Sequence, residues 1–267
     1  MPNRVESKFQ SLKRKRKKAF IAFITAGDPS LSVTEQLVLN FEKAGVDIVE
    51  LGVPFSDPLA DGPTIQAASE RALKKGITLA KILQTVKKIR QKSQIPITLM
   101  TYYNPIFHMG EERFMLGARQ AGVDGVIVPD LPLEEAQPLI KAAKRHRIAT
   151  IFFISPTTTM DRIKTIIRAS SGFIYYVSLT GVTGTREVLP SDLISKIRLA
   201  KRFSSKPVCV GFGVSTPAHV KLISRNADGV IVGSAIVKEI QKNSHQRDLV
   251  KRVSNFISRL TAPLESL

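Results

Sequence analysis

Short apolar runs recur along the chain and alternate with longer amphipathic stretches. Each run covers four to seven positions and does not change to polar at every second place. This is the pattern of strands that are buried on both faces of a parallel sheet. The sequence therefore predicts eight buried strands, at residues 19–25, 47–52, 97–102, 125–129, 149–154, 173–178, 207–210 and 229–232.

The stretches between these runs carry apolar residues at helical spacing. One helix is predicted to begin at Ser32, because Glu35 follows three residues later in the pattern of a capping box. The predicted helices cover residues 6–16, 32–44, 64–74, 78–93, 111–121, 134–145, 161–170, 191–201, 216–225, 235–242 and 247–260.

The alternation of strand and helix repeats about eight times, which is the count of a (β/α)₈ barrel. The sequence thus predicts an α/β TIM barrel with an extra N-terminal helix and short inserted helices. No linker or break in composition divides the chain, so we expect residues 1–267 to form one domain. The alternative is a doubly wound open sheet. It would not need so many units, and no Gly-x-Gly-x-x-Gly motif follows the first strand.

The composition suits a cytoplasmic protein. Of the 267 residues, 43% are hydrophobic, which is enough for a large core. No apolar run approaches the ~18 residues of a membrane-spanning helix, and the basic N-terminus has no apolar segment behind it. The one cysteine, Cys209, allows no internal disulfide, which is consistent with a reducing compartment.

The formal net charge is +18, and six consecutive basic residues occupy positions 13–18. We interpret this basic block as a solvated helix face that runs into the first strand. Contact with nucleic acid is the alternative, but no aromatic residues are interleaved with the block as in surfaces that stack bases. The charge excess also fits an anionic substrate.

A stiff, acidic loop follows the second strand. It contains three prolines and the carboxylates Glu50, Asp57 and Asp61, with no lysine or arginine beside them. Catalytic groups of barrel enzymes lie at the C-terminal ends of the strands. If Glu50 faces the barrel mouth, burial raises its pKa and it can act as both acid and base. The alternative is a carboxylate tied to a backbone turn.

Further polar residues near strand ends add to this picture. Asp61 should stay ionised in its loop, so the two acids would divide into a proton shuttle and a stabiliser of positive charge. Tyr175, in the sixth strand, either positions a substrate or fills the core. Asp57 and Asp130 could equally cap turns.

Glycines after the last two strands indicate a phosphate site. Gly211 and Gly213 follow the seventh strand, and Gly233 and Ser234 open a short helix after the eighth. Glycine lets the backbone N–H groups approach a ligand closely, and a helix N-terminus favours an anion. The alternative is a pair of ordinary turns.

The sequence lacks the residue patterns of metal-dependent, nucleophilic and Schiff-base catalysis. The four histidines are isolated, so no metal-ligand spacing appears, and no Ser-His-Asp or Cys-His set is plausible. Strand ends carry no lysine for a Schiff base. The sequence therefore favours metal-free acid–base catalysis on a small phosphorylated molecule.

Six segments, which span the chain in one order, resemble the tryptophan synthase alpha chain family. The stretch 50–66 is the most specific; the others are 23–29, 128–132, 181–184, 211–215 and 232–235. The resemblance implies a lyase of tryptophan biosynthesis that cleaves indole-3-glycerol phosphate to indole and glyceraldehyde 3-phosphate. In this family Glu50 would move the protons, Asp61 would stabilise charge at the indole nitrogen, and Tyr175 would lie beside the glutamate.

The resemblance also implies binding residues. Thr183 would reach Asp61 when its loop closes over the substrate. The phosphate would lie against Gly184, Gly211, Gly213, Gly233 and Ser234, and the indole between Phe23, Leu99 and Phe212.

Finally, the resemblance implies a partner. This is a beta chain that carries pyridoxal phosphate, in an α₂β₂ tetramer, while the present chain has no cofactor. The acidic loop and Asn104-Pro105 would form part of the interface. Two alternatives remain: a catalytically weak subunit that mainly activates the beta chain, and another phosphate-binding barrel such as a ketose-phosphate isomerase.

Overall fold

A computed structural model of the chain describes residues 3–177, 193–211 and 213–265. Its parallel strands form one sheet in the order β5-β4-β3-β2-β1-β9-β8-β7-β6. The strands are β1 (Ala19–Thr25), β2 (Ile48–Gly52), β3 (Ile97–Met100), β4 (Gly125–Ile127), β5 (Ala149–Ile151), β6 (Phe153–Ile154), β7 (Ile174–Tyr176), β8 (Val208–Gly211) and β9 (Gly229–Val232).

The two edges of this sheet belong to one predicted strand. β5 pairs with β4 and β6 pairs with β7, and only Phe152 separates β5 from β6. The chain itself therefore joins the edges into a nearly closed barrel. The predicted (β/α)₈ fold is confirmed, with the fifth strand interrupted once.

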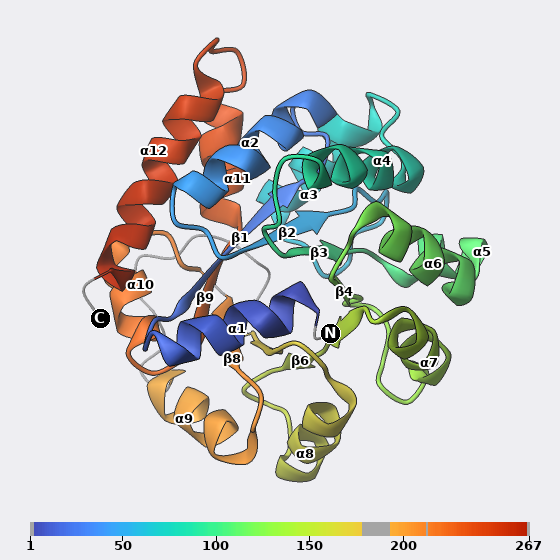
Figure 1. The fold of residues 1–267 in the computed structure, drawn as a ribbon, viewed down its shortest axis with the longest axis vertical. Coiled ribbons are helices and arrows are strands. Elements are labelled where there is room, and N and C mark those ends of the chain that lie inside the picture. The colour runs from blue at the N-terminus through green and yellow to red at the C-terminus, as the bar shows by residue number, and fades with distance from the viewer. Residues whose placement is uncertain (1–2, 178–192, 212, 266–267) are drawn as a thin grey trace.

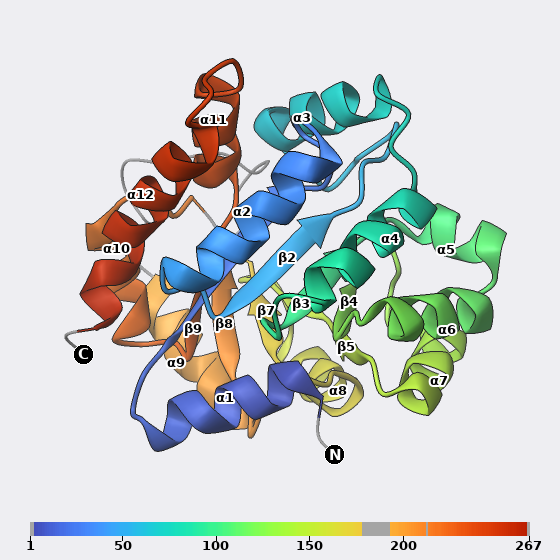
Figure 2. The same cartoon turned by 45° about the horizontal axis from the view of Figure 1, so that its top comes forward.

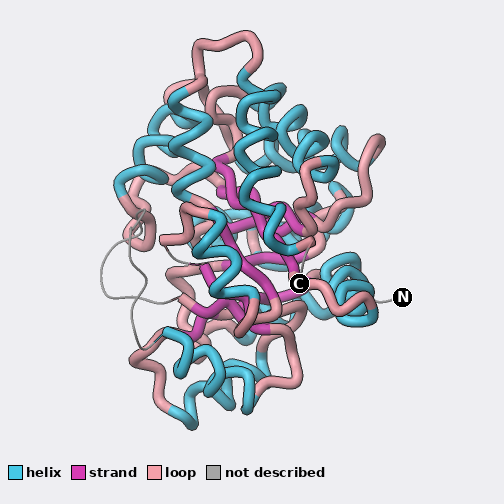
Figure 3. The backbone as a smooth tube through the Cα atoms, turned by 90° about the vertical axis from the view of Figure 1, so that its left-hand side faces the viewer, coloured by secondary structure: helices cyan, strands magenta, loops and turns pink. Residues whose placement is uncertain are grey.

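Helices cover the outside of the barrel (Figure 1), and the strands form its interior (Figure 3). None of the described helices is long and apolar enough to cross a membrane. The helices are α1 (Arg4–Arg14), α2 (Leu31–Lys43), α3 (Pro63–Leu73), α4 (Leu79–Arg90), α5 (Tyr103–Met109), α6 (Glu111–Ala121), α7 (Gln137–His146), α8 (Met160–Ala169), α9 (Leu193–Phe203), α10 (Pro217–Ser224), α11 (Ser234–Lys242) and α12 (Leu249–Thr261), followed by the 3₁₀ turn η1 (Ala262–Leu264).

Alternation along each strand decides which side chains face the helices. In β1, Phe20, Ala22 and Ile24 belong to the large core between the sheet and the helices. Ile21 and Phe23 point the other way, into the barrel. Because successive side chains of a strand point to opposite faces, the interior holds only every second residue. The same rule places Glu50 of β2 inside the barrel.

Helix α1 closes the N-terminal end of the barrel, beneath the strands in Figure 2. Its buried residues Val5, Phe9 and Leu12 pack in one cluster with residues such as Ile21 and Ile151 from inside the barrel. The Phe9 and Phe173 rings lie 5.8 Å apart. The site is thereby restricted to the opposite, C-terminal end.

Three aspartates stand just before strands and tie each strand to its neighbour. Asp47 precedes β2 and accepts a hydrogen bond from Phe20 N of β1 (2.9 Å). Asp124 and Asp228 make the same contact, in front of β4 and β9, to the first residues of β3 and β8 (2.9 and 3.0 Å). These carboxylates satisfy backbone N–H groups that lack a ladder partner at the strand starts.

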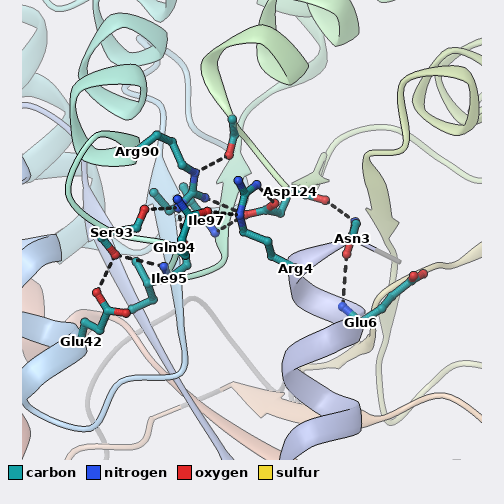
Figure 4. Close-up of polar contacts among 11 residues, drawn as sticks. Asn3, Arg4, Glu6, Glu42, Arg90, Ser93, Gln94, Ile95, Ile97 and Asp124 are labelled. Carbon is teal, nitrogen blue, oxygen red and sulfur yellow. Dashed lines mark hydrogen bonds and ion pairs between the residues drawn. The ribbon is translucent and has the colours of Figure 1, made fainter. Parts of the chain in front are cut away.

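Asp124 is the centre of the largest of these networks (Figure 4). Its carboxylate accepts from Arg4 Nη1 (2.9 Å) and Arg90 Nη2 (2.7 Å). Its backbone carbonyl accepts from Asn3 Nδ2 (2.7 Å). The network fixes α1 and the end of α4 to the start of β4.

Several predicted element boundaries are wrong. Helix α2 is capped by Ser30 and not Ser32, because Ser30 Oγ accepts from Val33 N (3.2 Å). Glu35 instead pairs with Lys92 Nζ (2.9 Å). The segment after the third strand forms helix α5 in place of a loop, and α7 begins three residues later than predicted, at Gln137.

Candidate active site

A pocket with about 570 Å³ of empty space opens at the C-terminal ends of the strands. Its walls combine apolar side chains, two carboxylates and glycine backbone. The lining residues are Phe23, Glu50, Ala60, Asp61, Ile65, Met100, Tyr175, Gly211, Gly213, Val214, Ile231, Gly233 and Ser234.

Glu50 is the most unusual side chain of this pocket. It is 0% exposed, and neither carboxylate oxygen has a hydrogen-bond partner in the described part of the chain. Burial, with a smaller contribution from the charge of Asp61, raises its pKa to about 8. A carboxylate without partners in an apolar surround is costly, so Glu50 holds a proton at neutral pH.

Asp61 lies across the pocket in a more polar environment. It is 7% exposed, and burial raises its pKa to about 6. The Tyr102 hydroxyl donates a hydrogen bond that opposes this rise. Ala60 N in turn donates to the Tyr102 hydroxyl (3.0 Å), and the Phe55 ring stacks on Tyr102 at 4.9 Å. The two acids therefore differ in protonation near pH 7, the arrangement that separates a proton shuttle from a fixed negative charge.

Tyr175 lies between Glu50 and the glycine-rich side of the pocket. Burial and the nearby charge of Glu50 raise its pKa well above the usual range, so the phenol stays protonated. A Cβ built on Gly211 would lie 2.6 Å from the Tyr175 hydroxyl oxygen. Only glycine at position 211 leaves room for this phenol.

Part of the pocket wall is built from backbone. Gly213 has φ 62, a conformation that favours glycine. Gly233 is the N-cap of α11, whose nine residues begin at Ser234. The first N–H groups of a helix have no partner within it, so α11 presents donors and its positive dipole end to the pocket.

The structure brings together most of the residues that the sequence predicted. Eight of them line the pocket: Glu50, Asp61, Tyr175, Phe23, Gly211, Gly213, Gly233 and Ser234. Thr183, Gly184 and Phe212 lie outside the described residues.

The placement of Leu99 was wrong. Leu99 is fully buried in the core between sheet and helices, whereas its neighbour Met100 lines the pocket. The register of β3 explains this, since Thr98 stands opposite Glu50 and the inward positions are therefore 98 and 100.

The sequence analysis also missed one contact and five wall residues, which are Ala60, Ile65, Met100, Val214 and Ile231. The contact is the hydrogen bond that Tyr102 donates to Asp61. Met100 could have been found by extending the strand alternation from Glu50 across the sheet. The Tyr102 contact joins two loops, and no local pattern marks it. Of the acids left open, Asp130 caps α5 by accepting from Tyr103 N (2.9 Å), and Asp57 is exposed.

Fold and pocket together define a barrel enzyme of the acid–base type. Among the described residues no group of histidine, cysteine and carboxylate side chains is arranged to hold a metal ion. The family model described as tryptophan synthase alpha chain matches residues 9–263, and the chain belongs to this family. Its members are lyases of tryptophan biosynthesis that cleave indole-3-glycerol phosphate.

Individual relatives match over nearly their whole length. The alpha chain of Geotalea daltonii is 51% identical over 97% of this chain and 98% of its own. That of Caldanaerobacter subterraneus is 47% identical over the same shares. Among solved structures, a tryptophan synthase subunit alpha from Legionella pneumophila superposes with a TM-score of 0.94 at 36% identity, covering 100% of both chains. A chain of Mycobacterium tuberculosis tryptophan synthase gives 0.90 at 34% identity, covering 99% of both.

Proposed function

We propose that the pocket performs the retro-aldol cleavage of indole-3-glycerol phosphate to indole and glyceraldehyde 3-phosphate, with Glu50 as its acid and base and Asp61 as the carboxylate that stabilises positive charge. The observation that carries this proposal is the environment of Glu50. It is fully buried, it has no partner in the described chain, and its pKa is about 8. Such a group can give a proton and take one back near neutral pH.

Glu50 supplies both proton transfers. As the neutral acid it protonates the indole ring carbon that carries the glycerol side chain. The resulting carboxylate then accepts the proton of the adjacent side-chain hydroxyl. As that proton leaves, the carbon–carbon bond breaks, its electron pair restores the indole ring, and the side chain departs as an aldehyde. The glutamate ends in its starting protonation state.

Asp61 stabilises the positive charge that protonation places on the indole nitrogen. Its pKa of about 6 keeps it mostly ionised at neutral pH. This carboxylate is already in position before the positive charge develops. It therefore stabilises the transition state, and the site does not have to reorganise during the reaction. Tyr175, a protonated phenol between Glu50 and Gly211, orients the substrate hydroxyl.

Binding follows the division of the pocket walls. The flat indole packs between the apolar side chains of Phe23 and Met100. The phosphate lies against the backbone of Gly211, Gly213 and Gly233 and against Ser234 at the start of α11. The resemblance adds Gly184 to the phosphate side, Phe212 to the indole side and Thr183 as a contact of Asp61.

A beta chain is the proposed partner, in an α₂β₂ tetramer in which that chain carries pyridoxal phosphate. Two large apolar side chains stand exposed: Leu59 in the acidic loop is 90% exposed and Phe107 in α5 is 68% exposed. Exposed apolar side chains support an interaction surface where they gather in one patch. Leu59 and Phe107 lie in the two segments that the resemblance assigns to the interface.

Three simpler expectations belong to the same proposal. The chain needs no cofactor of its own, since acid–base groups suffice for a retro-aldol cleavage. Residues 1–267 form one domain. The protein works in the cytoplasm.

The test is indole release from indole-3-glycerol phosphate by the pure chain, with and without a beta chain. We expect release in both conditions and a faster rate with the partner. Absence of indole in both conditions, from protein shown to be folded, would overturn the lyase proposal. Stimulation of the beta chain by such an inactive protein would support a regulatory subunit instead.

A further inference from the structure

A second large cleft lies at the other end of the barrel, away from the active site. It holds about 1570 Å³ of empty space between the end of α1 and the loops that precede β7 and β8. The basic block of residues 13–18 forms one wall, and the segment from α9 to β8 forms the other. Six cationic side chains line it: Lys13, Arg16, Lys17, Lys18, Lys201 and Lys206.

Among the described residues two carboxylates line the cleft with these cations, and a third, Asp47, lies near Lys17. Asp228 is already engaged, by Lys201 Nζ at 2.7 Å and Lys18 Nζ at 3.7 Å. Burial lowers the pKa of Lys206, the charge of Glu6 opposes this change, and Lys206 Nζ donates to the backbone carbonyl of Ile167. Lys13, Arg16 and Lys17 are exposed, and none has a salt-bridge partner among the described residues. The cleft therefore carries an excess of positive charge that the protein does not neutralise.

The positive surface continues beyond the cleft. A neighbouring hollow is lined by Arg198, Lys201, Arg202, Arg225 and Asn226, with no carboxylate. Lys201 belongs to both hollows, so the two form one band. Among the described residues Arg198 donates to the neutral Asn226 side chain (3.1 Å) and has no carboxylate partner. An extended band of this kind fits a chain of charges better than a single small anion.

The structure changes the interpretation of residues 13–18. The sequence suggested a solvated helix face, but α1 ends at Arg14 and Arg16 has φ 55. The chain turns there, so the basic block lies opposite the cationic side chains of α9 and of the loop that follows it. Cations that are distant in sequence thus converge on one concave surface.

Phosphate groups are the ligand chemistry that this surface favours. The one aromatic residue in the cleft lining, Phe9, is buried under α1, so no ring is offered for base stacking. Lysine and arginine without base contacts bind phosphates irrespective of sequence. We propose that this cleft binds a linear chain of phosphate groups, either the backbone of a single-stranded nucleic acid or inorganic polyphosphate.

Binding here is separate from catalysis. An apolar cluster fills the space between the cleft and the pocket of Glu50. It is formed by α1 and by inward-facing strand residues at the N-terminal end of the barrel, and it includes Phe9, Ile21 and Phe173. A phosphate chain in the cleft therefore leaves the active site open. Substitution of lysines in the cleft should leave lyase activity unchanged.

The experiment uses fluorescence anisotropy of a labelled oligothymidylate of about 16 nucleotides, with long-chain polyphosphate as competitor. We expect saturable binding at low salt, with an affinity that falls steeply as salt rises because counterions are released. Polyphosphate should compete, whereas free inorganic phosphate at the same phosphate concentration should not. Competition by polyglutamate as strong as that by polyphosphate would overturn the preference for phosphate.

Two double variants with the same change in charge locate the site. Lys13→Glu with Lys17→Glu alters the cleft, and Lys87→Glu with Lys88→Glu alters exposed lysines on α4. We expect the cleft variant to lose roughly 10-fold or more in affinity at low salt and the α4 variant to change little. Equal losses in the two variants, or binding of neither labelled oligothymidylate nor end-labelled polyphosphate by the unaltered protein, would overturn the proposal. Binding of polyphosphate alone would support it and assign the source.

Discussion

Buried carboxylates occur at both ends of this barrel, but their surroundings are opposite. At the N-terminal end Asp124 is 1% exposed and accepts hydrogen bonds from Arg4, Arg90 and the backbone N of Ile97. At the C-terminal end Glu50 is equally buried and has no partner among the described residues. At the N-terminal end the carboxylate is paired within the fold. At the C-terminal end the carboxyl group is left without a partner, so it can interact with a substrate.

The difference shows how one architecture separates stability from chemistry. Asp47, Asp124 and Asp228 each accept a hydrogen bond from a backbone N–H at the start of the neighbouring strand. These contacts therefore stabilise the pairing of the strands. Glu50 is held by the sheet against its own solvation preference, which shifts its pKa and makes it reactive. Substitution of Glu50 should therefore change mainly the activity, and substitution of Asp124 mainly the stability.

Glu50→Gln should produce the largest loss of activity. The side chain keeps its shape but can no longer move protons, so we expect indole release to fall by at least about 10²–10⁴-fold. Single-turnover assays with substrate in excess of its dissociation constant would measure this loss. Retained turnover would move the chemistry to another residue.

The same variant should be at least as stable as the unaltered chain above neutral pH. In the fold the pKa of Glu50 rises from 4.5 to about 8, so the folded state keeps a proton that the unfolded chain has lost. The free energy of unfolding should therefore decrease as pH rises from 4.5 to 8. Glu50→Gln should remove this part of the pH dependence, which urea titrations at several pH values would show. An unchanged slope would contradict the raised pKa.

Asp124→Asn should have the largest effect on stability. It leaves Arg90, whose side chain is 9% exposed, without its anionic partner. Breaking a buried ion pair in this way costs about 3 kcal/mol or more. We expect a clear drop in melting temperature, with normal indole release well below it. Asp248→Asn, which breaks an exposed pair with Arg252, is the control and should change the melting temperature little.

At the C-terminal end of the barrel, the sequence predicted which residues belong to the site better than it predicted how their side chains contact one another. Glycines and carboxylates that follow strands are recognisable one segment at a time, which is why Glu50, Asp61 and Gly213 could be named. Leu99 was misplaced because the inward face of a strand depends on its register with neighbours, and a shift of one residue reverses every side chain. The Asp61–Tyr102 contact joins separate loops and needs the fold.

The N-terminal end was predicted least well. Residues 13–18 look like a helix face in isolation, and nothing in the local pattern shows that Lys201 and Lys206 lie opposite them. The Asp124 network joins α1, α4 and β4, elements that are far apart in the chain. Such contacts follow from closure of the barrel and not from the residues beside them.

Gly211→Ala tests how closely the pocket is fitted around Tyr175. The added Cβ would lie 2.6 Å from the phenol oxygen, so the ring must move away from its position beside Glu50. Displacement of a positioning group by about 1 Å can cost 10²-fold in rate, and we expect a loss of that order in kcat/KM. Gly117→Ala on α6, where the nearest atom would be 3.7 Å away, is the matched control. Equal activity in the two variants would exclude a role for Tyr175.

Tyr102→Phe should give the smallest effect, a shift in pH dependence. The phenylalanine keeps the stacking on Phe55 but removes the hydroxyl that holds the pKa of Asp61 down to about 6. Asp61 must be ionised to stabilise the indole nitrogen, so the acidic limb of the profile of kcat/KM should move to higher pH by roughly half a unit to one unit. The alkaline limb should stay in place. Tyr103→Phe is the control, since that hydroxyl donates to Glu111 (2.5 Å) outside the pocket lining. An acidic limb that does not move in Tyr102→Phe would show that Asp61 is not the group whose ionisation limits cleavage.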